Sequence, residues 1–210
     1  MARRGREYPI RRLRRLTRPR RPSKVPNRGG RETMMTAVEF IGSDLKRMHA
    51  MLDAMIADLT PEQLHTVPAG HPKTNTIAWG FWHYVRTEDN VVRFVLQNRR
   101  PTVWAEGGYA ARLGLPPVAQ GTGMSTAEAQ ALRLKDIALF KDYMRKVWAS
   151  TEDFLAKVDP ADLDTIITVR PLGDMPKIRA MGQACLSHGM THVGEIELAR
   201  TLVGAAAQGV

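Results

Sequence analysis

Two histidines near the C-terminus have the spacing of metal ligands. His188 and His192 lie four residues apart in segment 185–196, which is predicted to be helical. At 3.6 residues per turn, this spacing places both imidazoles on one helix face, about 5–6 Å apart at Cβ. Two nitrogen donors so placed can bind one cation, and imidazole suits zinc, nickel, copper and iron. Alternatively, two of the six histidines of the chain could have this spacing by chance. A third ligand elsewhere in the chain would argue against chance.

His83 is the candidate third ligand. It lies in the middle of a predicted helix at about residues 76–97, between large apolar residues. By itself, a histidine in this setting is often only a hydrogen-bonded core residue. Helical bundles, however, build metal sites from inward side chains on facing helices, where His83, His188 and His192 would supply three neutral donors. Three protein ligands with an open position are typical of catalytic zinc, whereas structural zinc sites have four protein ligands.

Such a site would be chemically active. Coordination to a metal can lower the pKa of a water molecule to about 7, and it can deprotonate a thiol outright. Because imidazole must be neutral to bind a cation, the sequence predicts that metal affinity falls below about pH 6.5.

Four segments have the apolar periodicity of amphipathic helices and would position these histidines. They are residues 36–59, 76–97, 126–158 and 177–202. Thr74 or Asn75 is expected to cap the second helix, and Ser125 the third, through a capping box with Glu128. Gly80 would let another helix approach the second one closely. The pattern predicts an all-α four-helix bundle.

The segments between the helices carry weaker signals. Residues 98–125 are rich in Gly and Pro and form a long connection between the second and third helices. Connections of this length are unusual in compact domains and are often functional. Trp104 and Tyr109 are too hydrophobic for free solvent, so the connection is expected to fold back over one end of the bundle. Residues 160–177 could form a short strand or hairpin.

The positive charge of the chain is concentrated at its N-terminus. Residues 1–34 hold thirteen basic and two acidic residues, a net charge of +11, whereas residues 35–210 hold eighteen basic and nineteen acidic residues, a net charge of −1. An Arg- and Pro-rich segment cannot bury enough apolar surface to fold, so residues 1–34 are predicted to be a disordered tail. It is either an arm that binds polyanions such as nucleic acid, or a translated region upstream of a start at Met34 or Met35. We favour the second interpretation, because helical patterning begins directly after these methionines.

The rest of the chain is predicted to be one domain, with the bundle at residues 35–204 and a C-terminal tail at residues 205–210. Cys185 is the only cysteine, which excludes an intrachain disulfide and indicates a reducing compartment. No apolar run approaches the roughly eighteen residues of a membrane span, and no apolar segment of a secretory signal follows the arginines. A soluble, cytoplasmic protein is expected.

The histidines stand within two motifs that resemble those of the DinB/YfiT family. The motifs are Asn75-x-Ile77-Ala78-Trp79-x-x-Trp82-His83-x-x-Arg86-Thr87-Glu88-Asp89 and His188-x-x-x-His192-x-Gly194-Glu195-Ile196. The resemblance covers roughly residues 36–203. It implies an up-down-down-up bundle related to bacterial thiol-dependent S-transferases, with a divalent metal, zinc or nickel, on His83, His188 and His192. It also implies a homodimer and a low-molecular-weight thiol such as mycothiol, bacillithiol or glutathione.

Other residues near the histidines are candidates for further roles. Cys185 could face the metal, but a small buried hydrophobe is the expected role. Glu195 is the candidate catalytic residue, as an acceptor for a ligand histidine or a proton carrier, and the alternative is a solvated carboxylate. Arg170, Lys177 and Arg179 are candidates for binding an anionic thiol cofactor. Glu88 and Asp89 could orient an imidazole or bind Arg86 on the surface, and the surface role is favoured. His49 and His65 are expected to be surface or edge histidines and not ligands.

Three functions are compatible with these features. The first is a metal-dependent transferase that activates a thiol as a thiolate for attack on an electrophile. The second is a metal-dependent hydrolase or isomerase that uses a metal-bound water. The third is a non-catalytic bundle that binds a partner or a small ligand, with structural histidines.

Overall fold

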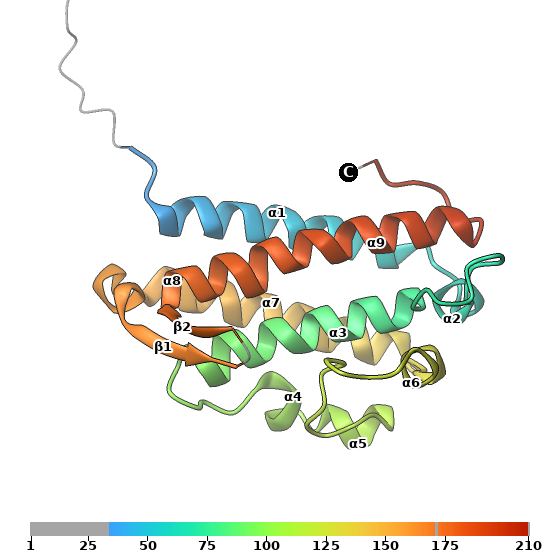
Figure 1. The fold of residues 1–210 in the computed structure, drawn as a ribbon, viewed down its shortest axis with the longest axis horizontal. Coiled ribbons are helices and arrows are strands. Elements are labelled where there is room, and N and C mark those ends of the chain that lie inside the picture. Colours follow the sequence, from blue (N-terminus) through green and yellow to red (C-terminus); the bar gives the residue numbers. More distant parts are fainter. Residues whose placement is uncertain (1–33, 171, 210) are drawn as a thin grey trace, which may run out of the picture. The chain divides into compact units, whose positions relative to one another are not determined.

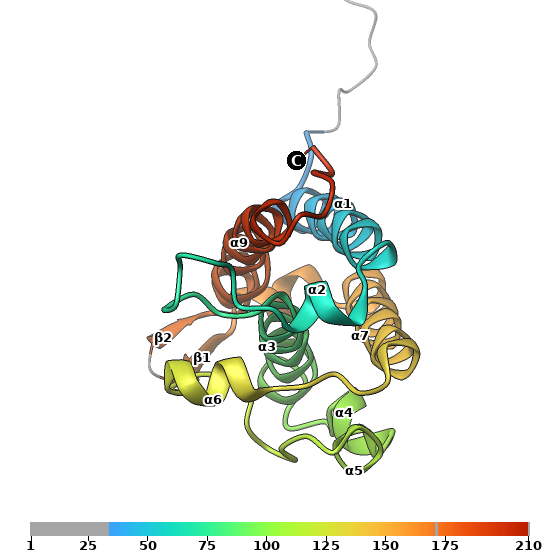
Figure 2. The ribbon, with the colours of Figure 1, turned by 90° about the vertical axis from the view of Figure 1, so that its right-hand side faces the viewer.

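The structure, a computed structural model, describes residues 34–170 and 172–209. Four long helical segments dominate this part of the chain. They are α1 (Ala37–Ala57), α3 with the π-helical η1 (Ile77–Asp89 and Asn90–Val95), α7 (Ile137–Lys157), and α8, η3 and α9 as one run (Lys177–Ala180, Met181–Ser187 and His188–Leu202). Helices α1 and α3 each pack against both α7 and α9 (Figure 2). In Figure 1, α1 and α9 run in one direction and α3 and α7 in the other. The predicted four-helix bundle with up-down-down-up order is confirmed.

The long connection returns the chain from the end of η1 to the start of α7 along the outside of the bundle (Figure 1). It contains the short helices α4 (Val103–Glu106), α5 (Tyr109–Leu113) and α6 (Thr126–Ala131). Trp104 and Tyr109 are both buried, and their rings pack with Tyr143 of α7. The connection therefore folds back onto the bundle as predicted, but it covers a side of the bundle and not one end.

The third predicted helix is broken, which is a correction. The predicted capping box between Ser125 and Glu128 is present, but it begins only the short α6. The chain is extended at Leu132, and Asp136 then caps α7 by accepting a hydrogen bond from the Leu139 amide. The break has a tertiary cause, because Leu132 and Leu134 are buried in the core and the Leu134 amide donates to His65 Nε2 of another element.

The start of the second helix also differs from the prediction. Thr76, and not Thr74 or Asn75, caps α3 by accepting a hydrogen bond from the Trp79 amide. The hydroxyl of Thr74 is used instead within the preceding turn, where it donates to the carbonyl of His71.

The remaining elements are small. Helix α2 (Pro61–His65) follows α1, and the 3₁₀ turn η2 (Pro160–Asp164) follows α7. Strands β1 (Ile166–Val169) and β2 (Gly173–Pro176) pair as an antiparallel hairpin, as the sequence suggested. None of the described helices combines the length and apolar character that a membrane crossing requires. The tail predicted at residues 1–34 lies, apart from Met34, outside the described residues.

Candidate metal centre

The three predicted ligands meet in the interior of the bundle. His83 comes from α3, and His188 and His192 come from the first two turns of α9. One ring nitrogen from each lies within 4.8 Å of the other two. The ring centroids are 5.2 Å apart for His83 and His188, 5.0 Å for His83 and His192, and 4.5 Å for the last pair.

These separations fit a shared cation. The Nε2 atoms of His188 and His192 face each other at 3.0 Å. Ligands bound to one ion at about 2.1 Å can lie at most about 4.2 Å apart, so small rotations of the rings suffice to close the set. Neutral imidazole is a donor for zinc or nickel, and the residues present therefore fit a divalent metal.

Two glycines allow the helices that carry these histidines to approach. A Cβ added at Gly80 of α3 would lie 3.2 Å from Ile196 Cγ1 of α9, so α9 packs directly over this glycine as predicted. A Cβ at Gly189 would lie 2.5 Å from Met48 Sδ of α1 and 2.6 Å from Tyr84 Cε2 of α3. At Gly189, the residue after His188, the α9 backbone therefore packs closely against side chains of both α1 and α3.

Neighbouring groups hold two of the rings. His83 Nδ1 donates to the carbonyl of Gln120 at 2.5 Å, and the ring stacks on Trp79 at a centroid distance of 4.6 Å. Glu195 Oε2 lies 2.8 Å from His192 Nδ1, although the pair is not aligned as a hydrogen bond. An outer hydrogen bond such as that from His83 to Gln120 sets the tautomer and orientation of a metal-ligating histidine. Glu195 is 59% exposed and bridges His192 to solvent.

Burial keeps the three imidazoles neutral. Desolvation lowers the pKa of His83 to about 4. The nearby His192 and His188 also lower this pKa, whereas the hydrogen bond to the Gln120 carbonyl raises it. Desolvation, with the His188 ring as a second cause, also lowers the pKa of His192 to about 4. The pKa of His188 is lowered for the same first reason. Neutral imidazole is the form that binds a metal, so the folded chain presents the donors already deprotonated at neutral pH.

These pKa values change the pH dependence expected from the sequence. Protons compete with the metal for His83 and His192 only near pH 4, and the pKa of His188 is also lowered, so the affinity of the folded protein should begin to fall at a lower pH than the 6.5 expected from the sequence. Isothermal titration with Zn²⁺ in non-chelating buffers measures this. A steep loss of affinity centred on pH 6.5 would contradict it.

The stability of the metal-free protein should depend on the same groups. Below about pH 6.5 the unfolded chain binds protons at these histidines and the folded chain does not, so the free energy of unfolding falls as pH drops from 6.5 towards 4. The slope is at most about 1.4 kcal/mol per pH unit for each of His83 and His192. Urea unfolding across this range measures it. The variant with alanine at all three histidines should show a smaller slope, and equal slopes would contradict the prediction.

A cavity of about 360 Å³ opens beside two of the candidate ligands. His83 and His188 line it, together with the side of the connection that carries Gln120. Its other polar lining residues are Thr87, Asn90, Thr122, Thr168, Arg170 and Gln183. Both π-helical segments, η1 and η3, contribute to its walls, and π-helical turns often occur at functional sites. The cavity gives a small molecule access to His83 and His188.

The three basic residues proposed for a thiol cofactor lie in different places. Arg170 lines the cavity beside His83 and His188. The ammonium of Lys177 is 2.9 Å from the Asp162 carboxylate, and Arg179 lines another depression, near the start of α1. Arg170 is thus the one of the three that lies beside the histidines. Cys185 is fully buried, as expected of a small core residue, and burial raises the pKa of its thiol.

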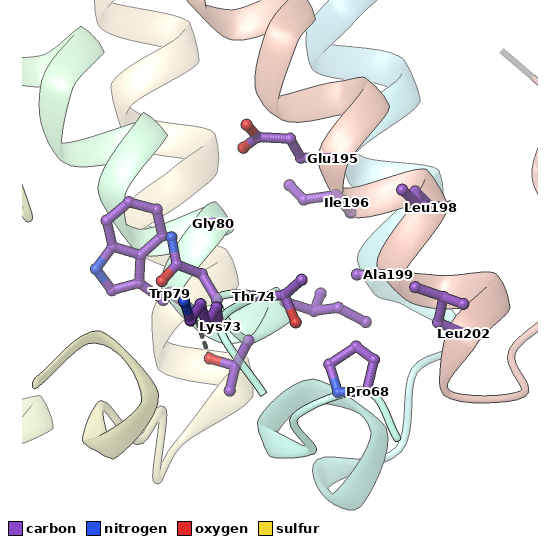
Figure 3. Close-up of a pocket in the computed structure, with 13 residues that line it drawn as sticks. Pro68, Lys73, Thr74, Trp79, Gly80, Glu195, Ile196, Leu198, Ala199 and Leu202 are labelled. Carbon is purple, nitrogen blue, oxygen red and sulfur yellow. Dashed lines mark hydrogen bonds between the residues drawn. The ribbon is translucent and has the colours of Figure 1, made fainter. Parts of the chain in front are cut away.

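A second cavity, of about 290 Å³, lies between the start of α3 and the C-terminal half of α9 (Figure 3). Its walls are largely apolar, with Ile196, Leu198 and Leu202 contributed by α9. Trp79 and Glu195 line it as well, and these same residues contact His83 and His192. The histidine cluster therefore lies between a cavity with many polar lining residues and a cavity with largely apolar walls.

A buried polar network next to the histidines was missed at the sequence level. Glu88 is fully buried, and it accepts hydrogen bonds from His49 at 3.0 Å, Tyr84 at 2.5 Å and Thr151 at 2.6 Å. Burial opposes its charge, but the His49 charge and these hydrogen bonds outweigh burial and lower the pKa of Glu88. Asp89 is also buried, and it accepts from the amides of Val103 and Trp104. The surface roles expected for Glu88, Asp89 and His49 are wrong.

Fold and site together define a four-helix bundle with a three-histidine centre between its second and last long helices. A model of the DinB superfamily matches residues 44–196, and the chain belongs to this superfamily. A crystal structure described as the conserved protein of locus from Enterococcus faecalis has the same fold, with a TM-score of 0.69 and 20% sequence identity over 80% of this chain and 98% of that one. A comparison with curated proteins finds no match.

Proposed function

We propose that this protein is a metal-dependent transferase that binds a divalent cation, zinc or nickel, on His83, His188 and His192 and acts on a low-molecular-weight thiol. The observation that carries the proposal is a cluster of three neutral imidazoles, two of which, His83 and His188, line a 360 Å³ cavity. A bound cation would supply the charge that keeps the sulfur of a coordinating thiol deprotonated.

The residues of the cavity suit a polar, anionic thiol. Arg170 provides a positive charge at its wall, and among the residues that the structure describes no acidic side chain lines it. Asn90 and Gln183 add amide groups that can recognise hydroxyl, amide or carboxylate groups. Mycothiol, bacillithiol and glutathione all belong to this chemical class. In this proposal Glu195 orients His192 and carries the thiol proton to solvent, while the sulfur bonds to the electrophilic carbon and the leaving group departs with its electron pair.

Two measurements test the proposal in order. Elemental analysis of freshly purified protein should find about one equivalent of zinc or nickel. In protein loaded with Co²⁺, a titration with each thiol should produce a sulfur-to-cobalt charge-transfer band for at least one of them. Metal without a thiol band would favour the hydrolase or isomerase, and protein that binds no metal would leave the non-catalytic bundle.

Arg170→Ala separates recognition from coordination. This variant should keep its metal, because Arg170 is not a ligand, and should bind the thiol about tenfold more weakly, as expected for the loss of one charge-assisted hydrogen bond. Lys177→Ala is the matched control, since Lys177 is paired with Asp162 away from the cavity. Equal thiol affinity in both variants would remove Arg170 from the site.

The remaining expectations belong to the same proposal. The homodimer implied by the family is measured by light scattering of the purified protein. Localisation in the cytoplasm stays a prediction from composition, and residues 1–34 are still expected to be a region upstream of the start, with nucleic-acid binding as the alternative.

A further inference from the structure

The long connection reaches the candidate metal centre at one peptide. Gln120 is the residue whose carbonyl accepts the hydrogen bond from His83 Nδ1 at 2.5 Å. Because a carbonyl can only accept, this contact requires the proton to be on Nδ1. The other ring nitrogen, Nε2, then carries the lone pair that a cation needs.

Gly121, the next residue, has no room for a side chain. It is buried and has φ +100, a conformation that L side chains rarely adopt. A Cβ added there would lie 2.7 Å from His83 Nδ1 and 3.2 Å from both Cβ and Cγ of the same residue. The obstructing atoms thus belong to the His83 side chain, and the nearest of them is the ring nitrogen that is bonded to the Gln120 carbonyl.

The peptide is placed by contacts from the same helix that carries His83. Arg86, one turn further along α3, is buried and donates from Nη2 to the Val118 carbonyl at 3.1 Å. Its guanidinium lies 4.7 Å from the centroid of Trp104, whose Nε1 donates to the Pro116 carbonyl at 3.2 Å. The connection is therefore tied to α3 shortly before it meets His83.

We infer that the Gln120–Gly121 peptide is a positioning element of the metal centre, in which the carbonyl selects the His83 tautomer and Gly121 is required for the close approach. The inference rests on the proposed metal site for its effect on affinity. The hydrogen bond acts through the backbone, so the amide side chain of Gln120 is not needed for it.

Gly121→Ala and Gly123→Ala form a matched pair. Both glycines have positive φ, +100 and +81, so alanine strains the backbone at either position, but a Cβ at Gly123 would meet nothing within 4 Å. Gly121→Ala should weaken Zn²⁺ binding about 10- to 100-fold, the usual cost of losing an outer partner of a ligand histidine. Gly123→Ala should keep the wild-type affinity. Equal affinities in the two variants would overturn the inference.

The tautomer of His83 is a readout that does not depend on metal. Long-range ¹H–¹⁵N spectra of the metal-free protein should show the Nδ1–H form of His83 in the wild type and in Gly123→Ala. Gly121→Ala should show loss of this form or a mixture of tautomers. An unchanged Nδ1–H signal in Gly121→Ala would overturn the role of the peptide even if metal binding fell.

A double-mutant cycle of thermal midpoints tests the inference even if Gly121→Ala folds poorly. In the His83→Ala background the ring is absent and only the Cβ contact at 3.2 Å remains, so Gly121→Ala should lower the thermal midpoint little more than Gly123→Ala does. In the wild-type background it should lower the midpoint clearly more. Equal losses in both backgrounds would overturn the inference, whereas wild-type protein that binds no metal would overturn only the proposed function.

Discussion

Replacing any one of His83, His188 and His192 by alanine is expected to weaken Zn²⁺ binding by more than about 100-fold, because a lost ligand costs more than a lost outer partner. The three single losses should not add in the double and triple variants, since residues that bind one ion are energetically coupled. Isothermal titration, with competition against a chelator where the wild type binds tightly, measures both effects.

The control for these variants is His71→Ala. His71 is exposed and is not part of the histidine cluster, so its removal should leave metal affinity unchanged. His49 would be a poor control, because it is buried in the Glu88 network. If one of the three alanine variants kept wild-type affinity, that histidine would not be a ligand and the proposed function would lose its basis.

Replacing Glu88 by alanine is expected to have the largest effect on stability. The carboxylate joins three of the four long helical segments, with partners His49 on α1, Tyr84 on α3 and Thr151 on α7. Its removal leaves three buried donors without an acceptor and a cavity between the helices. Breaking a buried pair of this kind costs about 3–5 kcal/mol of the free energy of unfolding. Urea unfolding of the metal-free protein measures this loss.

Asp153→Ala is the matched control for the loss of an acidic partner. Asp153 pairs with Lys157 on the surface of α7, and both side chains are more than half exposed. Exposed pairs one helical turn apart contribute only about 0.3–0.5 kcal/mol, so this variant should unfold almost as the wild type does. Glu88→Ala with an equally small loss would show that the buried network adds little to stability.

The helices were predictable from the sequence where local contacts define them. The capping box of Ser125 and Glu128 involves residues three apart, and it is present in the structure. The break after α6 was not predictable in the same way, because the apolar residues around it keep a helical spacing. The hydrogen bond from Leu134 to His65 that accompanies the break joins residues 69 positions apart.

The burial of Glu88 and Asp89 was likewise not predictable from the local sequence. Glu88 and Asp89 follow one another in the sequence, and a helix of period 3.6 places consecutive residues on different faces. Both are nevertheless buried, because α3 lies at the centre of the fold, with α7 and α9 on two sides and the long connection on another. Hydropathy alone counts such residues as exposed, since ionised side chains are seldom buried without partners.

The sequence by itself determined the donor types and the common face of His188 and His192, because a four-residue spacing on a helix is a local property of the backbone. It also indicated the number of helices, through apolar periodicity. Only the tertiary structure decided that His83 points at the other two rings, and that the carbonyl of Gln120, 37 residues further along the chain, holds its Nδ1. Periodicity specifies which face of a helix is buried, but the partner of that face depends on how distant segments pack.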